Sequence, residues 1–84
     1  MEEKGVVKMI IVISAPERLV PQLEQMVSKY YKTWRVEPAV RFGSISAIDD
    51  KGTTTTICQF SFDEEYANIK QLFWLKMREK GLIK

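Results

Sequence analysis

The feature that most limits the folds open to this chain is a nearly continuous aliphatic segment over residues 6–13, interrupted only by Lys8. Successive side chains of a β-strand point to opposite faces of a sheet, so a strand here places Ile10 and Val12 on one face and further aliphatic residues on the other. A strand that is apolar on both faces is typical of a sheet that is covered on both sides. In a chain of 84 residues, we expect a second protein surface to provide one of the two covers.

Length and composition predict one globular domain over residues 1–84. Hydrophobic residues make up 45% of the chain and charged residues 29%, which is ordinary for a folded soluble protein. The longest uninterrupted apolar run, residues 9–13, is far shorter than the roughly 20 residues of a membrane span, so we expect no membrane association. The single cysteine cannot form an internal disulfide and the N-terminal segment lacks a signal-peptide pattern, which together favour a cytoplasmic location.

The spacing of apolar and turn-forming residues predicts the element order β-α-β-β-α. A helical period follows a proline and an acid that favour a helix start, and acidic residues again open the last helix. Gly52 provides the positive φ angle that a tight turn between two strands requires. The expected elements are a strand over residues 6–14, a helix over 19–32, a strand over 34–49, a strand over 53–62 and a helix that begins at 63–65 and stops at Gly81.

The strand over residues 34–49 is expected to lie at a sheet edge and to contain a bulge. Pro38 lacks the backbone N–H that a central strand donates to its neighbour. The apolar positions change parity after Gly43, and one extra residue there would return both halves to the same face. On the returning strand, Cys58 and Phe60 are expected to face the helices, with Ile57 on the opposite side of the sheet.

These elements predict an α+β fold with a three-stranded sheet in the order 1-3-2 and two helices on one face. The crossover between the first two strands should be right-handed, and the second and third strands should form a hairpin. The architecture resembles a ferredoxin-like fold truncated before its last strand. The first strand then has a free edge in addition to its second apolar face, and both features favour contact with another protein.

The expected helix-free face of the sheet is the main candidate for a functional surface. Branched aliphatic side chains surrounded by polar residues are typical of a protein interface with a polar rim. The last helix offers a second candidate contact because its apolar arc is unusually wide, although a partly buried core position explains Trp74 equally well. The predicted interface residues are Ile10, Val12 and Ile57 on the sheet and Trp74 and Leu75 on the helix, with an expected rim of Lys8, Arg41, Ser46, Thr55 and Gln59.

This surface predicts a non-catalytic interaction or regulatory module that forms a homodimer or docks on a partner protein. A different topology, or terminal residues that fold over the same face, would also explain the double-sided strand. The sequence does not separate self-association from docking, because an apolar face does not specify the protein that covers it.

Nucleic-acid binding by residues 29–41 is the alternative function. Cations attract phosphate and aromatic rings can stack on bases, but the net charge of +2 is small for a dedicated nucleic-acid binder. Phe42, Phe60 and Phe62 are expected to face the helices, whereas an RNA-binding sheet presents its aromatic residues on the open face. The candidate residues are Lys29, Lys32, Trp34, Arg35 and Arg41.

Catalysis is not expected. The chain contains no histidine, which removes the usual general base and the commonest metal ligand. Asp49 and Asp50 occupy a turn, where local backbone hydrogen bonding already explains acidic residues. Cys58 has the parity of a buried strand residue, and no glycine-rich phosphate loop is present. We therefore expect no catalytic residue, no cofactor and no metal site.

Overall fold

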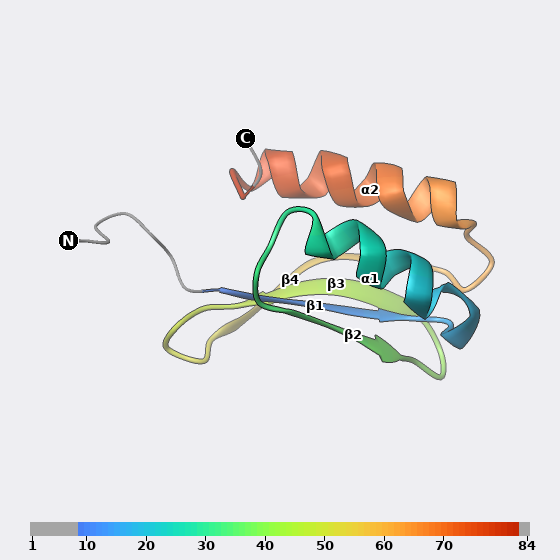
Figure 1. Cartoon of the computed structure of the whole chain (residues 1–84), viewed down its shortest axis with the longest axis horizontal. Helices are drawn as coiled ribbons and strands as arrows, with labels where there is room; N and C mark the ends of the chain where they lie inside the picture. Colours follow the sequence, from blue (N-terminus) through green and yellow to red (C-terminus); the bar gives the residue numbers. More distant parts are fainter. Residues whose placement is uncertain (1–8, 83–84) are drawn as a thin grey trace.

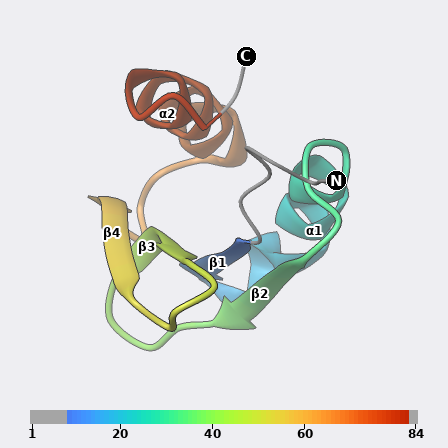
Figure 2. The same cartoon turned by 90° about the vertical axis from the view of Figure 1, so that its left-hand side faces the viewer.

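Residues 9–82, which the computed structural model describes, form a four-stranded sheet and two α-helices (Figure 1). Both helices pack on the same face of the sheet, and the four strands form a layer beneath them (Figure 2). The elements in chain order are β1 (Ile10–Ala15), a short 3-10 helix (Glu17–Leu19), α1 (Val20–Ser28), β2 (Trp34–Pro38), β3 (Gly43–Ile48), β4 (Thr54–Phe60) and α2 (Tyr66–Glu79).

Strand β1 lies inside the sheet, in the order β2-β1-β3-β4. It pairs with β2 in parallel, with Ile13 beside Val36, and with β3 in antiparallel, with Ile13 beside Ile45. Helix α1 makes the connection between β1 and β2, because parallel neighbours need a crossover rather than a tight turn. The α+β class and the two helices on one face thus agree with the sequence-based expectation.

The predicted three-stranded sheet of order 1-3-2 is wrong, because residues 34–49 form two strands and not one. Strand β2 ends at Pro38, and residues 39–42 pass the end of β1 before β3 begins at Gly43 on its other side. The change of apolar parity at Gly43 therefore marks a new strand and not a bulge. Strand β1 has neighbours on both sides and no free edge, and this strand order does not confirm the ferredoxin-like arrangement. Pro38 does lie on an edge strand, as predicted.

The turn between β3 and β4 is where the sequence placed it. Gly52 has a φ angle of 87°, a left-handed conformation that glycine adopts without steric cost. The Asp49 carboxylate accepts hydrogen bonds from the backbone N–H groups of Lys51 and Thr53, both at 2.9 Å. These bonds hold the turn closed through a side chain, which is the usual role of aspartate in such turns.

One hydrophobic core fills the space between the sheet and the helices. Alternate residues of β1 and β3 point into it, and the inner faces of α1 and α2 close it from above. Burial of a large aliphatic side chain stabilises a fold by roughly 1.5–3 kcal/mol, so this layer provides most of the stability. The buried side chains are Ile11, Ile13, Ala15, Leu19, Leu23, Met26, Val27, Ile45, Ala47, Ile57, Phe60, Ile69, Phe73 and Met77.

Gly43 allows a close contact at the start of β3. The Phe60 ring from β4 lies directly over this glycine, and a Cβ atom at position 43 would overlap ring atoms of Phe60. A ring that covers a glycine on the neighbouring strand is a known device for pinning strand register. The close packing of Phe60 therefore requires the glycine.

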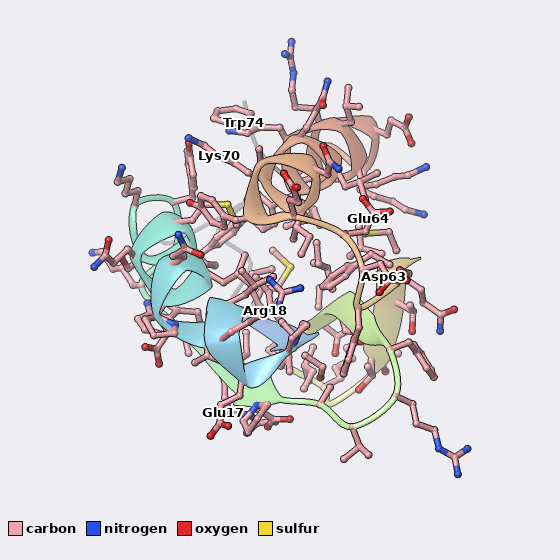
Figure 3. All side chains as sticks on the ribbon, turned by 90° about the vertical axis from the view of Figure 1, so that its right-hand side faces the viewer. Glu17, Arg18, Asp63, Glu64, Lys70 and Trp74 are labelled. Atoms are coloured by element: carbon pink, nitrogen blue, oxygen red, sulfur yellow. The ribbon has the colours of Figure 1, made fainter. Side chains whose placement is uncertain are left out.

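Three further contacts join the helices to the rest of the fold. The Arg18 guanidinium donates a 2.8 Å hydrogen bond to the Phe62 carbonyl, which links the start of the first helical segment to the connection before α2 (Figure 3). The Tyr31 hydroxyl donates a 2.8 Å bond to the Leu82 carbonyl, and burial raises the pKa of this hydroxyl above its ordinary value. The Tyr30 ring packs edge-on against Trp74, with 5.0 Å between ring centroids.

Candidate interaction surface

The sheet has a second face, opposite the helices, which we call the open face. Among residues 9–82, both helices lie on the other side of the sheet (Figure 2). Strand alternation and pairing register assign eleven side chains to this face. They are Ile10, Val12 and Ser14 of β1, Arg35 and Glu37 of β2, Ser44, Ser46 and Ile48 of β3, and Thr54, Thr56 and Gln59 of β4.

The aliphatic side chains of the open face gather at one end of the two central strands. Ile10 of β1 lies directly beside Ile48 of β3, and Val12 follows on the same face two residues further along β1. All three side chains are partly exposed. Directly paired residues on one face lie about 4.5–5.5 Å apart, so these three form a contiguous patch, which we call the aliphatic patch.

Short hydroxyl side chains occupy most of the remaining open face. Ser46 lies beside both Val12 and Thr56, and Ser14 lies beside Ser44. Serine projects little above the sheet, so the centre of the face is low and flat. A flat face of small residues allows another protein layer to approach closely, whereas long side chains at its centre would hold the layer away.

Among residues 9–82, the charges of the open face lie at its β2 edge. Arg35 and Glu37 form an ion pair there, and both side chains are substantially exposed. An exposed ion pair contributes little to stability, about 0–1 kcal/mol, because water screens it. In a contact with another protein, the ion pair has a different effect. The two charges restrict which protein surfaces can lie opposite the β2 edge.

The loop between β2 and β3 carries two exposed large apolar side chains. Val40 is 91% exposed and Phe42 is 51% exposed. Phe42 lines a shallow hollow with Gln59 and Ser61, so the apolar surface continues beyond the hydroxyl end of the open face. From the sequence, we expected Phe42 to face the helices. That expectation is wrong because residue 42 precedes a new strand instead of continuing an old one.

The structure separates the predicted sheet interface residues. Ile10 and Val12 lie on the open face, whereas Ile57 is buried in the core with 9% of its surface exposed. The cause is a register shift in β4 opposite Ile45 and Ser46, which turns Ile57 toward the helices. Ile48 occupies the corresponding place in the aliphatic patch. The prediction omitted Ile48, although it has the same strand parity as Ser46, which was placed on the helix-free face.

The structure also places the predicted rim residues in different parts of the fold. Ser46 and Gln59 lie on the open face, but Thr55 lies beside the buried Ala47 and therefore on the helix side. Arg41 is in the exposed loop between β2 and β3. Lys8 lies outside the described residues. A rim of hydroxyl groups around the aliphatic patch is thus present, made of partly different residues.

The two predicted contact residues of α2 differ in exposure. Trp74 is partly buried, and its ring packs against Tyr30 on the side of α2 that faces α1 (Figure 3). Leu75 is 53% exposed. The contact with Tyr30 gives Trp74 a role inside the fold, so Leu75 is the freer of the two for contact with another protein.

The structure does not bring the predicted nucleic-acid residues together. Lys29 and Lys32 lie before β2, whereas Arg41 lies beyond its other end, and a strand of five residues is about 16 Å long. Trp34 packs against the core from the helix side, while Arg35 points to the open face and pairs with Glu37. These positions do not form a continuous basic surface.

Cys58 is a partly buried thiol on the helix side of the sheet, beside Ile45. Burial raises the pKa of this thiol above its ordinary value, and the positive charge of Lys76 on α2 lowers it in part. The thiol therefore has little thiolate character at neutral pH, which is the state of a packing residue rather than a nucleophile.

Within residues 9–82, no three histidine, cysteine, aspartate or glutamate side chains are grouped closely enough to hold a metal ion. No helix in that range has the length and apolar character needed to cross a membrane. The chain matches no protein-family model, no curated protein and no solved structure.

Proposed function

We propose that this protein is a small non-catalytic interaction module that self-associates into a homodimer through the open face of its sheet. The observation that carries this proposal is the aliphatic patch of Ile10, Val12 and Ile48, which lies partly exposed on the face that neither helix covers. Removal of such side chains from water favours association in proportion to the apolar area buried. The neighbouring serines and threonines provide hydrogen-bonding groups, and the Arg35 beside Val12 is paired with Glu37.

The size of the open face sets the expected strength of the contact. Four strands about 4.8 Å apart, each about 20 Å long, give a footprint of roughly 19 by 20 Å. That footprint is smaller than the ~800 Å² that each partner contributes to a standard complex. We therefore expect a weak dimer that forms only at high protein concentration and dissociates on dilution, with the exposed Phe42 loop able to extend the contact.

The proposed compartment is the cytoplasm. Its support is the single cysteine, Cys58, which is a free thiol and fits a reducing environment.

The test is sedimentation equilibrium of the wild-type protein and two glutamate variants over a range of protein concentrations. Val12→Glu places a charge in the aliphatic patch, so the dimer should dissociate at concentrations where the wild type is dimeric. Leu75→Glu is the matched control, because Leu75 is exposed on α2 and away from the sheet. We expect Leu75→Glu to dimerise as the wild type does.

Two outcomes would contradict the proposal. A dimer that survives Val12→Glu but dissociates with Leu75→Glu would place the contact on α2. A wild-type protein that remains monomeric at several hundred micromolar would exclude self-association, and docking on another protein would then replace it as the function of the open face.

A further inference from the structure

Exposed cations and aromatic rings lie together along the side of α2 that faces α1. Trp74 is on that side, because its ring packs edge-on against Tyr30, the second residue after α1, with 5.0 Å between the ring centroids. Lys70 and Arg78 lie one turn before and one turn after Trp74, and residues four apart share one side of a helix. Figure 3 shows Lys70 and Trp74 together on this side. With Lys29, which precedes Tyr30, these residues form what we call the helix-face cluster.

The two rings of the cluster are held in place and still reach the surface. Tyr30 also packs against Phe73, which has no exposed surface, with 6.1 Å between the ring centroids. Tyr30 itself is 37% exposed, and Trp74 is partly exposed. A side chain that is already fixed loses little conformational freedom when a ligand binds to it. The ring pair is thus preorganised to receive a flat aromatic group.

Three exposed cations flank this ring pair, namely Lys29, Lys70 and Arg78. In the described part of the chain, none of the three takes part in an ion pair. Lys29 and Arg78 lie at helix C-termini, where a positive charge also stabilises the helix. Lys70 is the fifth residue of α2, so this reason does not explain its charge.

The neighbouring carboxylates lie on other sides of the two helices. Asp63 and Glu64 precede α2 and lie on the flank away from α1 (Figure 3). Glu79 pairs with Lys76, which is two positions from the tryptophan of the cluster and therefore about 160° around α2 from it. Glu24 lies about 140° around α1 from the lysine of the cluster. The cluster is therefore a locally basic surface in a chain whose net charge is only +2.

The cluster is long enough for several nucleotides. Lys70 and Arg78 are about 12 Å apart along the axis of α2, at 1.5 Å per residue. Stacked nucleotides of one strand repeat every ~3.4 Å, so about three to four of them span this length. Proteins that bind single strands combine a basic track for the phosphates with aromatic side chains on which bases stack. A duplex hides the faces of its bases within the stack, so exposed rings favour a single strand.

From these observations we infer that the helix-face cluster binds single-stranded nucleic acid, with bases against the two rings and phosphates on the three cations. The site lies on the helices and not on the open face, so the inference is independent of the proposed self-association. It retains Lys29 from the residues that the sequence suggested for nucleic-acid binding and replaces the others. Three phosphate contacts predict weak binding, with a slope of about −2 for the logarithm of the binding constant against the logarithm of the salt concentration.

The first test is the fluorescence anisotropy of a labelled oligothymidylate titrated with the protein at several salt concentrations. Lys70→Gln and Arg78→Gln each remove one exposed cation of the cluster, so each should weaken binding and reduce the salt slope by about 0.7. Arg41→Gln is the matched control, because it removes the same charge from the exposed loop between β2 and β3. We expect Arg41→Gln to bind as the wild type does. Circular dichroism of all three variants should match the wild type, because the substitutions are at exposed positions.

The second test measures the tryptophan of the cluster directly. The chain has two tryptophans, and the other one, Trp34, packs against the core from β2. In a Trp34→Phe variant the remaining fluorescence comes from Trp74, and a base that stacks on the ring should quench it when the oligothymidylate is added. In a Trp74→Phe variant the fluorescence of Trp34 should not change.

Four results would overturn the inference. One is the absence of an anisotropy change at low salt, and another is binding that leaves the fluorescence of Trp74 unchanged. A loss of affinity in Arg41→Gln as large as that in Lys70→Gln would show attraction by net charge and not by the cluster. Tighter binding of a duplex of the same length, or equally effective competition by inorganic polyphosphate, which has no bases, would show that the cluster recognises phosphate without base stacking.

Discussion

The two faces of β1 differ in surroundings although they are built from the same residue types. Ile11 and Ile13 have no exposed surface, whereas Ile10 and Val12 on the other side of the strand remain partly exposed. The difference comes from the topology, since both helices of residues 9–82 return to one side of the sheet. Aliphatic residues alone therefore do not indicate the core. The position of these residues relative to the covering helices indicates which of them belong to the core.

The neighbours of each face support different roles. On the helix side, Phe60, Phe73 and Met77 fill the space around the strand residues, and no polar or charged side chain of the described chain is buried there. On the open face, serine and threonine border the aliphatic patch on its β3 and β4 side, and Arg35 lies beside Val12 on its β2 side. The covered face therefore maintains the fold, and we expect the open face to act in recognition, where hydroxyl groups can exchange water for a partner at little cost.

The largest expected effect comes from an acidic substitution on each side of β1. Ile13→Asp places a carboxylate where the side chain has no exposed surface and no polar partner. The resulting penalty is several kcal/mol, comparable with the roughly 5–15 kcal/mol that holds a small domain folded. We expect Ile13→Asp to lose its cooperative unfolding transition in urea, followed by circular dichroism.

The matched control is Val12→Asp, one residue away on the open face. At a protein concentration where the wild type is monomeric, this substitution should lower the free energy of unfolding by about 1 kcal/mol, the cost of aspartate in a strand. If the two variants were equally destabilised, Val12 would be buried within its own chain, and the distinction between the faces would disappear.

Local residue patterns predicted the features that depend on local chemistry. The alternation in β1 identified its two apolar faces, and the glycine at position 52 identified the turn before β4. The residues after β1 also indicated the start of a helical segment. Each of these features is determined within a few residues, so the sequence alone contains the necessary information.

Strand order required information that no short segment carries. The parallel pairing of β1 with β2 is made between residues separated by the whole of α1, and the change of apolar parity at Gly43 looks locally like a bulge in one long strand. The register shift that buries Ile57 depends on its pairing with β3. The prediction therefore placed Ile57 on the helix-free face with Ile10 and Val12, whereas the structure buries Ile57 and places Ile48 beside Ile10 on that face.

A smaller effect is expected from alanine substitutions at two adjacent positions of β3. Gly43→Ala adds a Cβ atom that would overlap the Phe60 ring on the covered side. Overpacking of a core typically costs about 1–3 kcal/mol, because side chains or backbone must shift. Ser44→Ala removes one hydroxyl from the open face and should change the free energy of unfolding by less than about 0.5 kcal/mol. Urea titration of both variants measures the difference, and equal stabilities would show that Phe60 can move away without cost.

The smallest effect concerns the reactivity of thiols on the two faces and leaves the fold intact. Burial raises the pKa of Cys58, so its reaction with a disulfide reagent should reach half-maximal rate at a higher pH than that of an exposed thiol. Gln59→Cys in a Cys58→Ala background provides that exposed thiol at the next position, on the open face. Lys76→Met should raise the pKa of Cys58 further, because it removes the charge that lowers it.

Reaction rates measured against pH at a dilute, monomeric protein concentration test both expectations. A Cys58 that reacts as fast as the residue 59 thiol at neutral pH would show that α2 leaves this side of the sheet open to reagents, and the contrast between a covered and an open face would then not extend to β4.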